Sequence, residues 1–199
     1  MKIIVDMSSL MWTALLVGKD VEATEAIRED GKVFAVNTAA YGYENAINML
    51  VKSMDENGCT PKDLILVVEG LESKAPRKAI SPDYKFGDSK VPEQYIQFNL
   101  LKEKLVQTLR DLGAIAVTQP YVEGDDIIAY LAKNMEDDCI IQTGDNDLAV
   151  LNGKNAYGAD VTVRVGGEYA KNKYGDFPFK LITLYKALVG DPSDKIKGV

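Results

Sequence analysis

Histidine is absent from the 199-residue sequence, and cysteine occurs only at positions 59 and 139. Zinc sites are usually built from these two residue types, so a zinc site is not expected. Cys139 lies within a predicted strand, which argues against a disulfide framework and for a reducing compartment. No stretch approaches the roughly 20 apolar residues of a membrane span. The first two residues lead directly into a predicted strand rather than a signal peptide, and we therefore expect a cytoplasmic protein without membrane association.

Apolar residues make up 46% of the sequence, and their spacing predicts one α/β domain. Short apolar runs are expected to form strands at 2–6, 63–68, 114–117 and 139–144, buried on both faces as in a parallel sheet. Helical periodicity predicts helices at about 8–17, 35–57, 93–112 and 123–131. In the third of these, the core-facing stripe comprises Phe98, Leu101, Leu105, Leu109 and Leu112. Polar stretches at 18–32 and 71–92 are expected to be loops.

Acidic residues follow three of the predicted strands. Asp6 ends the first, Glu69 follows the second, and Asp145 and Asp147 follow the run from Cys139. Ligands of open α/β sheets bind outside the carboxyl ends of the strands. These carboxylates are therefore expected to face one crevice.

Nine acidic residues in total stand at expected strand ends and helix starts: Asp6, Glu69, Glu123, Asp125, Asp126, Asp145, Asp147, Asp191 and Asp194. Carboxylates are hard oxygen ligands, which suit Mg²⁺ or Mn²⁺ and not zinc. A cluster of this kind predicts metal-assisted attack on a phosphodiester.

The net charge of −7 appears at first to disfavour a nucleic-acid partner. Once the nine proposed ligands are set aside, 21 acidic residues remain against 23 Lys and Arg, which leaves about +2. Bound divalent ions would add further positive charge. The charge of the whole chain is therefore weak evidence against phosphate binding.

Each acidic motif also has a structural interpretation. The group Glu123, Asp125 and Asp126 stands at the start of a helix whose Ile127, Ile128 and Leu131 point inward, where acids favourably meet the helix dipole. Glu123 and Asp126 share a face of that helix. The pair Asp145 and Asp147 fits a plain turn, whereas an EF-hand is excluded because its Gly and terminal Glu are missing. For the helix motif taken alone, capping and metal binding are about equally supported, and the Asp145 and Asp147 pair alone is only a moderate metal signal.

The stretch 71–92 is irregular and basic, and it leaves the acidic strand end at Glu69. It can guide a phosphate backbone toward metals, although a solvated surface loop is the simpler interpretation. Within it, Tyr84 is a candidate for stacking on a base or for a half-buried loop position. Trp12, on the first helix, is expected to be a core residue.

Five motifs occur in order along the chain: Asp6-Met7-Ser8-Ser9-Leu10; Glu69-Gly70 with Arg77 and Pro82-Asp83-Tyr84-Lys85; Val122-Glu123-Gly124-Asp125-Asp126; Thr143-Gly144-Asp145-Asn146-Asp147; and Gly190-Asp191-Pro192-Ser193-Asp194 through Val199. Together they resemble the 5′-nuclease superfamily, which includes bacteriophage 5′–3′ exonucleases and flap endonucleases and the 5′-nuclease domain of bacterial DNA polymerase I. Glu69 departs from the family pattern, in which Asp is usual.

The resemblance implies a PIN-like 5′-nuclease α/β fold over residues 1–199, with a mainly parallel central sheet flanked by helices and a helical-arch segment at about 71–92. The nine acids match family ligands of two Mg²⁺ or Mn²⁺ ions, and Arg77 and Lys85 match basic catalytic residues at the scissile phosphate. The expected nucleic-acid-binding residues are Lys74, Arg77, Lys78, Tyr84, Lys85 and Lys90.

The function implied by the resemblance is a structure-specific 5′ nuclease that hydrolyses DNA by two-metal catalysis and leaves 5′-phosphate products. Its expected partners are DNA with 5′ ends, flaps or nicks, including RNA primers, in replication and repair. We expect a monomer in the cytoplasm, or in the host cytoplasm for a bacteriophage protein. The alternatives are a PIN-type ribonuclease and a non-catalytic, structure-specific nucleic-acid-binding protein.

The printed sequence stops at Val199, where the family continues into a helix-hairpin-helix region that binds duplex DNA and often K⁺. The chain is therefore expected to be a fragment of a longer protein or a naturally short member, and K⁺ is expected only where such a region is present.

Overall fold

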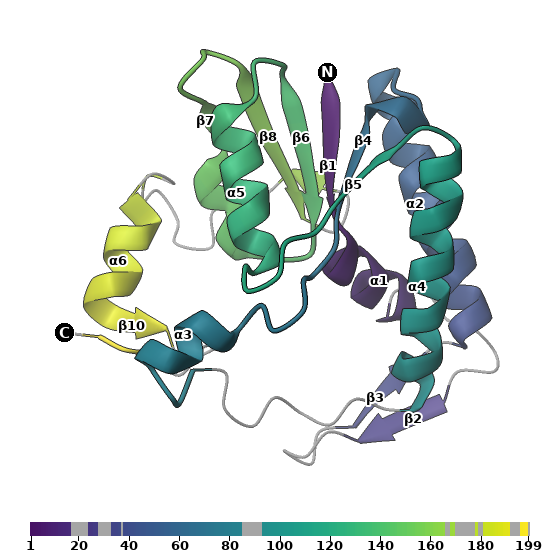
Figure 1. The fold of residues 1–199 in the computed structure, drawn as a ribbon, viewed down its shortest axis with the longest axis horizontal. Helices are drawn as coiled ribbons and strands as arrows, with labels where there is room; N and C mark the ends of the chain where they lie inside the picture. Colours follow the sequence, from purple (N-terminus) through teal and green to yellow (C-terminus); the bar gives the residue numbers. More distant parts are fainter. Residues whose placement is uncertain are drawn as a thin grey trace.

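A computed structural model describes residues 1–16, 24–27, 33–36, 38–84, 93–165, 168–169, 178, 181–191 and 196–198. At its centre lies a mainly parallel sheet in the order β5-β4-β1-β6-β8-β7, with β9 paired to β8. These strands are β1 (Lys2–Asp6), β4 (Leu64–Val67), β5 (Ile115–Val117), β6 (Cys139–Thr143), β7 (Gly153–Lys154), β8 (Asp160–Val165) and β9 (Glu168–Tyr169). Figure 1 shows the sheet between helices on both sides.

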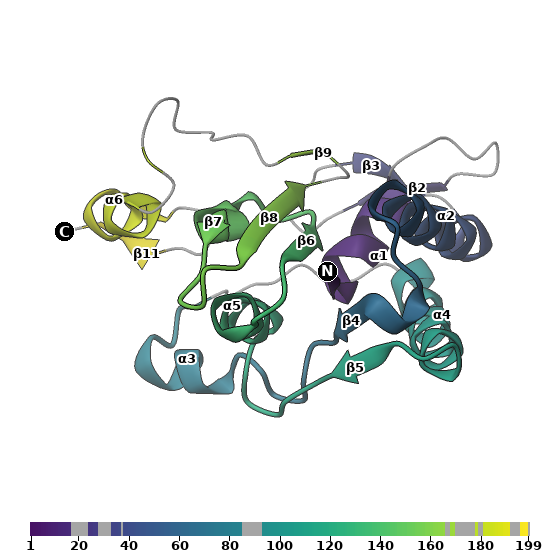
Figure 2. The same ribbon diagram turned by 90° about the horizontal axis from the view of Figure 1, so that it is seen from above.

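Two helical layers cover the sheet, and Figure 2 shows them from above. On one face lie α1 (Met7–Leu16), α2 (Ala39–Asn57) and α4 (Glu93–Asp111), while α5 (Gly124–Asn134) covers the other. Near α5, along the lower left of Figure 1, are α3 (Ala75–Ile80), α6 (Ile182–Val189), β10 (Gly190–Asp191) and β11 (Ile196–Lys197). The fold is thus a three-layer α/β arrangement.

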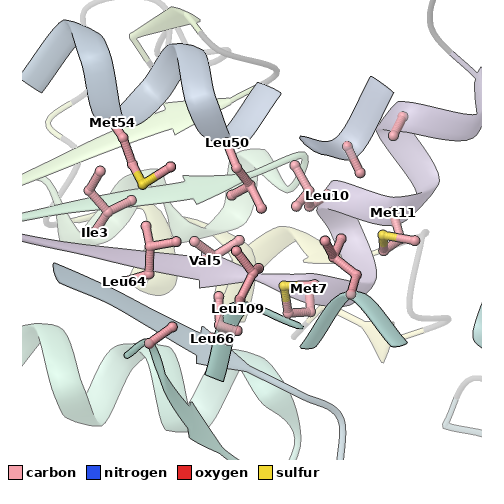
Figure 3. Close-up of a cluster of buried hydrophobic side chains, with 14 of the residues drawn as sticks. Ile3, Val5, Met7, Leu10, Met11, Leu50, Met54, Leu64, Leu66 and Leu109 are labelled. Carbon is pink, nitrogen blue, oxygen red and sulfur yellow. The ribbon is translucent and has the colours of Figure 1, made fainter. Parts of the chain in front are cut away.

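The core is divided by the sheet because successive strand residues point to opposite faces. Ile3 and Val5 of β1 pack with Leu50 and Leu109 from the helices on the first face, and Figure 3 shows this cluster. Ile4, between them, packs on the other face with Ile128 of α5. Both faces of β1 are therefore buried, which is why its central residues, Ile3, Ile4 and Val5, are all apolar.

Helix α2 shows how local sequence sets an element's limits. The Thr38 side chain accepts a hydrogen bond from the backbone N–H of Tyr41 at 3.3 Å, which caps the helix. At the other end, Gly58 adopts a left-handed conformation with φ of 61°, which glycine permits without steric cost. The predicted termination at Gly58 is therefore confirmed.

Several sequence-based boundaries were wrong. The stretch predicted as a loop at 18–32 includes β2 (Thr24–Ile27), which pairs antiparallel with β3 (Val33–Val36), so α2 begins at Ala39 rather than near residue 35. Part of the second predicted loop forms α3. Leu112, expected in the core, is exposed because α4 ends at Asp111.

Predictions about several individual side chains are confirmed. Cys59 and Cys139 are both free thiols, and Trp12 packs partly buried against the first core cluster. Ile127 and Ile128 of α5 are buried as expected. In the part of the chain that the structure describes, the helices are all too short or too polar to cross a membrane.

Candidate metal-dependent nuclease site

The register of the parallel strands brings three predicted ligands to the same edge of the sheet. Asp6 pairs in register with Val67, and Glu69 follows two residues later. On the other side of β1, Val5 pairs with Gln142, so Thr143 ends β6 level with Asp6 and Asp145 lies just beyond it. The edge predicted from the sequence is therefore present.

Asp6 is half-buried at this edge and held by two donors. One carboxylate oxygen accepts from the backbone N–H of Ser9 at 3.0 Å, and the other accepts from the Thr143 hydroxyl at 2.9 Å. Burial raises the pKa of Asp6; the two hydrogen bonds oppose this, while the negative charges of Asp145 and Glu69 add to it. Like charges thus gather here, an arrangement that a bound cation would relieve.

Glu69 links the end of β4 to the start of α5. Its carboxylate accepts from the Ser73 hydroxyl and, at 3.4 Å, from the backbone N–H of Gly124. A Cβ atom at position 124 would lie 3.3 Å from the Glu69 carboxylate, so glycine allows this close approach. The longer side chain of Glu69 therefore reaches the helix terminus.

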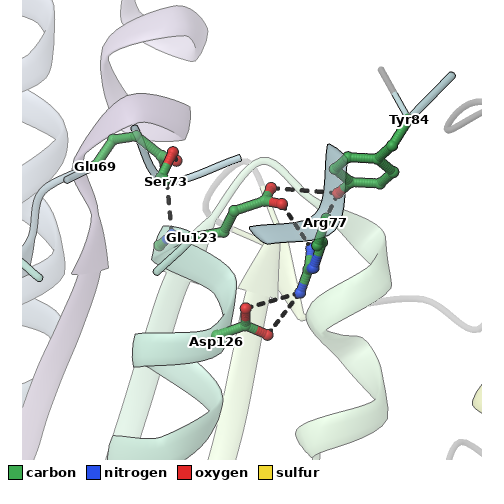
Figure 4. A network of polar contacts seen from close by, with 7 residues as sticks. Glu69, Ser73, Arg77, Tyr84, Glu123 and Asp126 are labelled. Atoms are coloured by element: carbon green, nitrogen blue, oxygen red, sulfur yellow. Dashed lines mark hydrogen bonds and ion pairs between the residues drawn. The ribbon is translucent and has the colours of Figure 1, made fainter. Parts of the chain in front are cut away.

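Arg77 of α3 joins the acids of α5 in the network drawn in Figure 4. Its guanidinium donates to both Asp126 carboxylate oxygens at 2.7 Å and to Glu123 at 2.9 Å. Tyr84 accepts from Arg77 at 3.0 Å and donates to Glu123 at 3.3 Å. Burial works to lower the pKa of Arg77, but Tyr84 and the two carboxylates outweigh it and raise that pKa.

A second cation binds two further acids of the predicted set. Lys186 of α6 donates to Asp147 and, at 2.6 Å, to Asp191. Burial works to lower the pKa of Lys186, but the two carboxylates outweigh burial and raise that pKa. Sequence reasoning missed this residue; its only local signal is a lysine five positions before Asp191 in an otherwise apolar stretch.

Asp145 is positioned by its own loop. Its backbone N–H donates to the Thr143 hydroxyl at 3.0 Å, and its carboxylate accepts from the backbone N–H of Asp147 at 2.8 Å. This second bond caps the 3₁₀ helix η2 (Asn146–Leu151). The turn interpretation and the ligand interpretation of this motif are therefore compatible.

A cavity of about 680 Å³ connects the two cation-centred networks. Its lining includes Arg77, Lys186 and five of the predicted ligands: Asp125, Asp126, Asp145, Asp147 and Asp191. Asp6, Glu69 and Glu123 are not part of this lining. Five carboxylates and three cations, Arg77, Lys133 and Lys186, thus line one polar hollow.

The donor chemistry of this region fits Mg²⁺ or Mn²⁺, since it consists of carboxylate oxygens. Within the described residues, however, no three His, Cys, Asp or Glu side chains converge closely enough to hold one ion. In this structure Arg77 and Lys186 each bind two of the carboxylates that ligation would use. Ion binding would require these pairs to rearrange.

The predicted basic residues are distributed unevenly. Lys74 precedes α3 and the exposed Lys78 lies within it, and neither is part of the cavity lining. Tyr84 is 5% exposed, so it positions Arg77 rather than offering an open stacking surface. Asp194, Lys85 and Lys90 lie outside the described residues.

Lys102 of α4 is a further cation that sequence reasoning missed. Burial lowers its pKa, while the negative charges of Glu69, Glu103 and Asp6 oppose that shift. Because Lys102 is part of a long amphipathic helix, its sequence context resembles that of any surface lysine.

Comparisons with known proteins agree with this geometry. The family described as "5′-3′ exonuclease, N-terminal resolvase-like domain" matches residues 2–175. The thermostable DNA polymerase I of Thermus thermophilus is 33% identical over 167 residues, which cover 81% of this chain and 18% of the polymerase. The chain therefore spans less than a fifth of this relative's length.

Solved structures show the same fold. The bacteriophage T5 D15 protein co-crystallised with metal ions has a TM-score of 0.67 and 18% identity, covering 99% of this chain and 68% of that one. The T5 D15 flap endonuclease in complex with DNA and metal ions has a TM-score of 0.64 and 17% identity, covering 99% and 69%. These likenesses confirm the PIN-like α/β fold. From the match over residues 2–175, which includes the first four of the five motifs, the chain belongs to the 5′-3′ exonuclease family of the 5′-nuclease superfamily.

Proposed function

We propose that this chain is the catalytic domain of a divalent-metal-dependent 5′ nuclease that hydrolyses DNA near 5′ ends, flaps or nicks and leaves 5′-phosphate products. The observation that carries the proposal is the cavity lined by five carboxylates, from α5, from η2 and its N-cap, and from β10, together with three cations, beside the half-buried Asp6. Membership of the 5′-3′ exonuclease family supports the reaction class. The DNA complex of the T5 protein supports DNA as substrate.

The acidic residues would hold two Mg²⁺ or Mn²⁺ ions. When bound, such ions supply an activated water nucleophile and neutralise charge developing on the phosphate. The ligands would be the nine acids predicted from the sequence, of which the described eight lie at the sheet edge, around α5 or beside Lys186. Their mutual repulsion, evident at Asp6, favours cation binding.

Arg77 and Lys186 would act on the substrate phosphate. In the structure they bind the carboxylates, and each is partly exposed, with side-chain exposure of 40% and 20%. Ligation of the acids would release these groups within the same cavity, where a guanidinium can bind a phosphate through two parallel hydrogen bonds. The described part of the proposed arch segment, chiefly α3, would thus carry a cation whose partner changes from carboxylate to phosphate.

Replacing Lys186 with methionine should tighten Mn²⁺ binding roughly fivefold, about 1 kcal/mol. The ammonium competes for Asp147 and Asp191, so its removal abolishes both the competition and the repulsion of the incoming ion. Isothermal titration calorimetry measures this directly. Lys154→Met is the matched control, because Lys154 also pairs with an aspartate, Asp160, but lies outside the cavity lining. Unchanged or weaker Mn²⁺ affinity in Lys186→Met would contradict the competition.

The function itself is tested by incubating the protein with 5′-labelled flap, nicked-duplex and single-stranded DNA, and with the matching RNA strands, in Mg²⁺ or EDTA. Cleavage only in Mg²⁺, dependent on a 5′ end and leaving 5′-phosphates, is expected. Preferential RNA cleavage would favour the ribonuclease alternative. Binding without cleavage in either metal or chelator would favour a non-catalytic role.

A further inference from the structure

A second hollow, of about 580 Å³, opens beside the candidate site. It lies between α3 and β11, two elements whose connecting sequence spans more than one hundred residues. Ile80 of α3 and Ile196 of β11 line it and are 88% and 49% exposed. Its size falls within the range of small-ligand sites, about 300–1,000 Å³.

The two hollows share a wall. Arg77 and Tyr84 line both, and Arg77 binds Tyr84 at 3.0 Å and Asp126 at 2.7 Å. A group seated against Ile80 therefore lies on the opposite side of this pair from the carboxylates. Any chain crossing the wall would pass directly over the Arg77 guanidinium.

The remaining lining supplies polar groups and a second cation. Lys197 and Arg77 provide positive charge, while Ser81 and Asp83 offer a hydroxyl and a carboxylate. The hollow thus combines apolar surfaces, hydrogen-bonding groups and cations beside a site suited to phosphodiester chemistry. This combination fits a nucleotide, whose base has apolar faces and a polar edge and whose phosphates are anionic.

We propose that this second hollow binds an unpaired nucleobase of the strand being cleaved, within three nucleotides of the scissile phosphate; the inference rests on the proposed function. The base lies against Ile80 and Ile196, and its polar edge faces Ser81 and Asp83. Arg77 and Lys197 bind the flanking phosphates. Arg77 then holds the strand at the boundary between the base site and the carboxylates.

An abasic scan tests the proposal by binding rather than cleavage. A flap DNA is prepared with one abasic nucleotide at each of the three positions on either side of the expected cleavage point. Affinity is measured by fluorescence anisotropy with Ca²⁺ in place of Mg²⁺, so that the acids hold an ion, and with the DNA checked to be intact. The proteins are the parent, Ile80→Ala, Ile196→Ala, and the control Ile115→Ala, whose 54% exposed side chain lies on β5 outside the hollow.

For the parent, one abasic position should weaken binding at least fivefold, because the DNA then loses the base whose apolar faces are buried against Ile80 and Ile196. Ile80→Ala and Ile196→Ala should weaken binding of the intact DNA similarly and lose sensitivity to that position, whereas Ile115→Ala should behave as the parent. Thermal melting by circular dichroism checks that each variant is folded.

An abasic effect that persists undiminished in both isoleucine variants, or that occurs at no position, would overturn the base site while leaving the nuclease proposal intact. If the parent binds none of these DNAs, both proposals are overturned. If one isoleucine variant fails to fold, the other still decides, because the two residues come from separate elements.

Discussion

Cleavage by an Asp145→Asn protein in Mg²⁺ should fall at least a hundredfold, about 2.7 kcal/mol of transition-state stabilisation. The substitution removes one of the two negative charges, those of Asp145 and Glu69, that act on the half-buried Asp6. It preserves the local fold, since asparagine also caps helix N-termini and its carbonyl can accept from the Asp147 N–H as the carboxylate does. The loss would therefore report on charge and not on a collapsed loop.

The matched control is Asp160→Asn, which changes the same side chain on β8, outside the cavity lining. Asp160 pairs with Lys154 and is largely exposed, so its substitution should leave cleavage within twofold of the parent. Parent-like cleavage by Asp145→Asn, with an unchanged melting temperature, would remove Asp145 from the proposed ligands.

The second large effect is expected at Arg77. Arg77→Met should slow cleavage at least tenfold, or 1.4 kcal/mol, because a phosphate contact is lost. In EDTA it should also destabilise the fold by about 1–2 kcal/mol, since Glu123 is 4% exposed and loses its cationic partner. This figure is below the 3–5 kcal/mol typical of broken buried pairs because Arg77 itself is 40% exposed.

Mg²⁺ should reduce the stability defect of Arg77→Met, because bound ions would neutralise Glu123 and Asp126 in its place. The two effects are measured by single-turnover cleavage and by urea unfolding with and without Mg²⁺. Arg110→Met, at the last turn of α4, serves as the control for loss of an arginine. A stability defect of equal size in Mg²⁺ and EDTA, with cleavage unaffected, would make Arg77 a purely structural residue.

The sheet edge was predictable because it depends on local signals. The runs before Asp6 and Glu69 are apolar, and the run before Asp145 begins with three apolar residues. These runs indicate buried parallel strands, and parallel strands place their carboxyl ends together. The spacing of Glu123 and Asp126 likewise predicted a shared face, and Arg77 binds both. What the spacing could not supply was Arg77 as the partner, because it lies 46 and 49 residues away.

The role of Lys186 could not be predicted from the sequence either, because it depends on a partner that is distant in the sequence. Its partners are Asp147, 39 residues earlier, and Asp191, on the strand that follows its helix. The short β2–β3 hairpin was missed because the polar residues around it resemble a loop, and hydrogen bonding between the two strands stabilises it despite that composition. Leu112 was assigned to the core by its spacing, but the helix ends one residue before it.

Mn²⁺ binding measured by electron paramagnetic resonance tests the central claim most directly, because free and bound Mn²⁺ are counted without any substrate. We expect the parent protein and Asp160→Asn to bind two Mn²⁺ ions per chain, and Asp145→Asn to bind at least one fewer at the same free Mn²⁺ concentration. Equal Mn²⁺ binding by all three proteins, or none by the parent, would contradict the assignment of these carboxylates as a metal-dependent nuclease site.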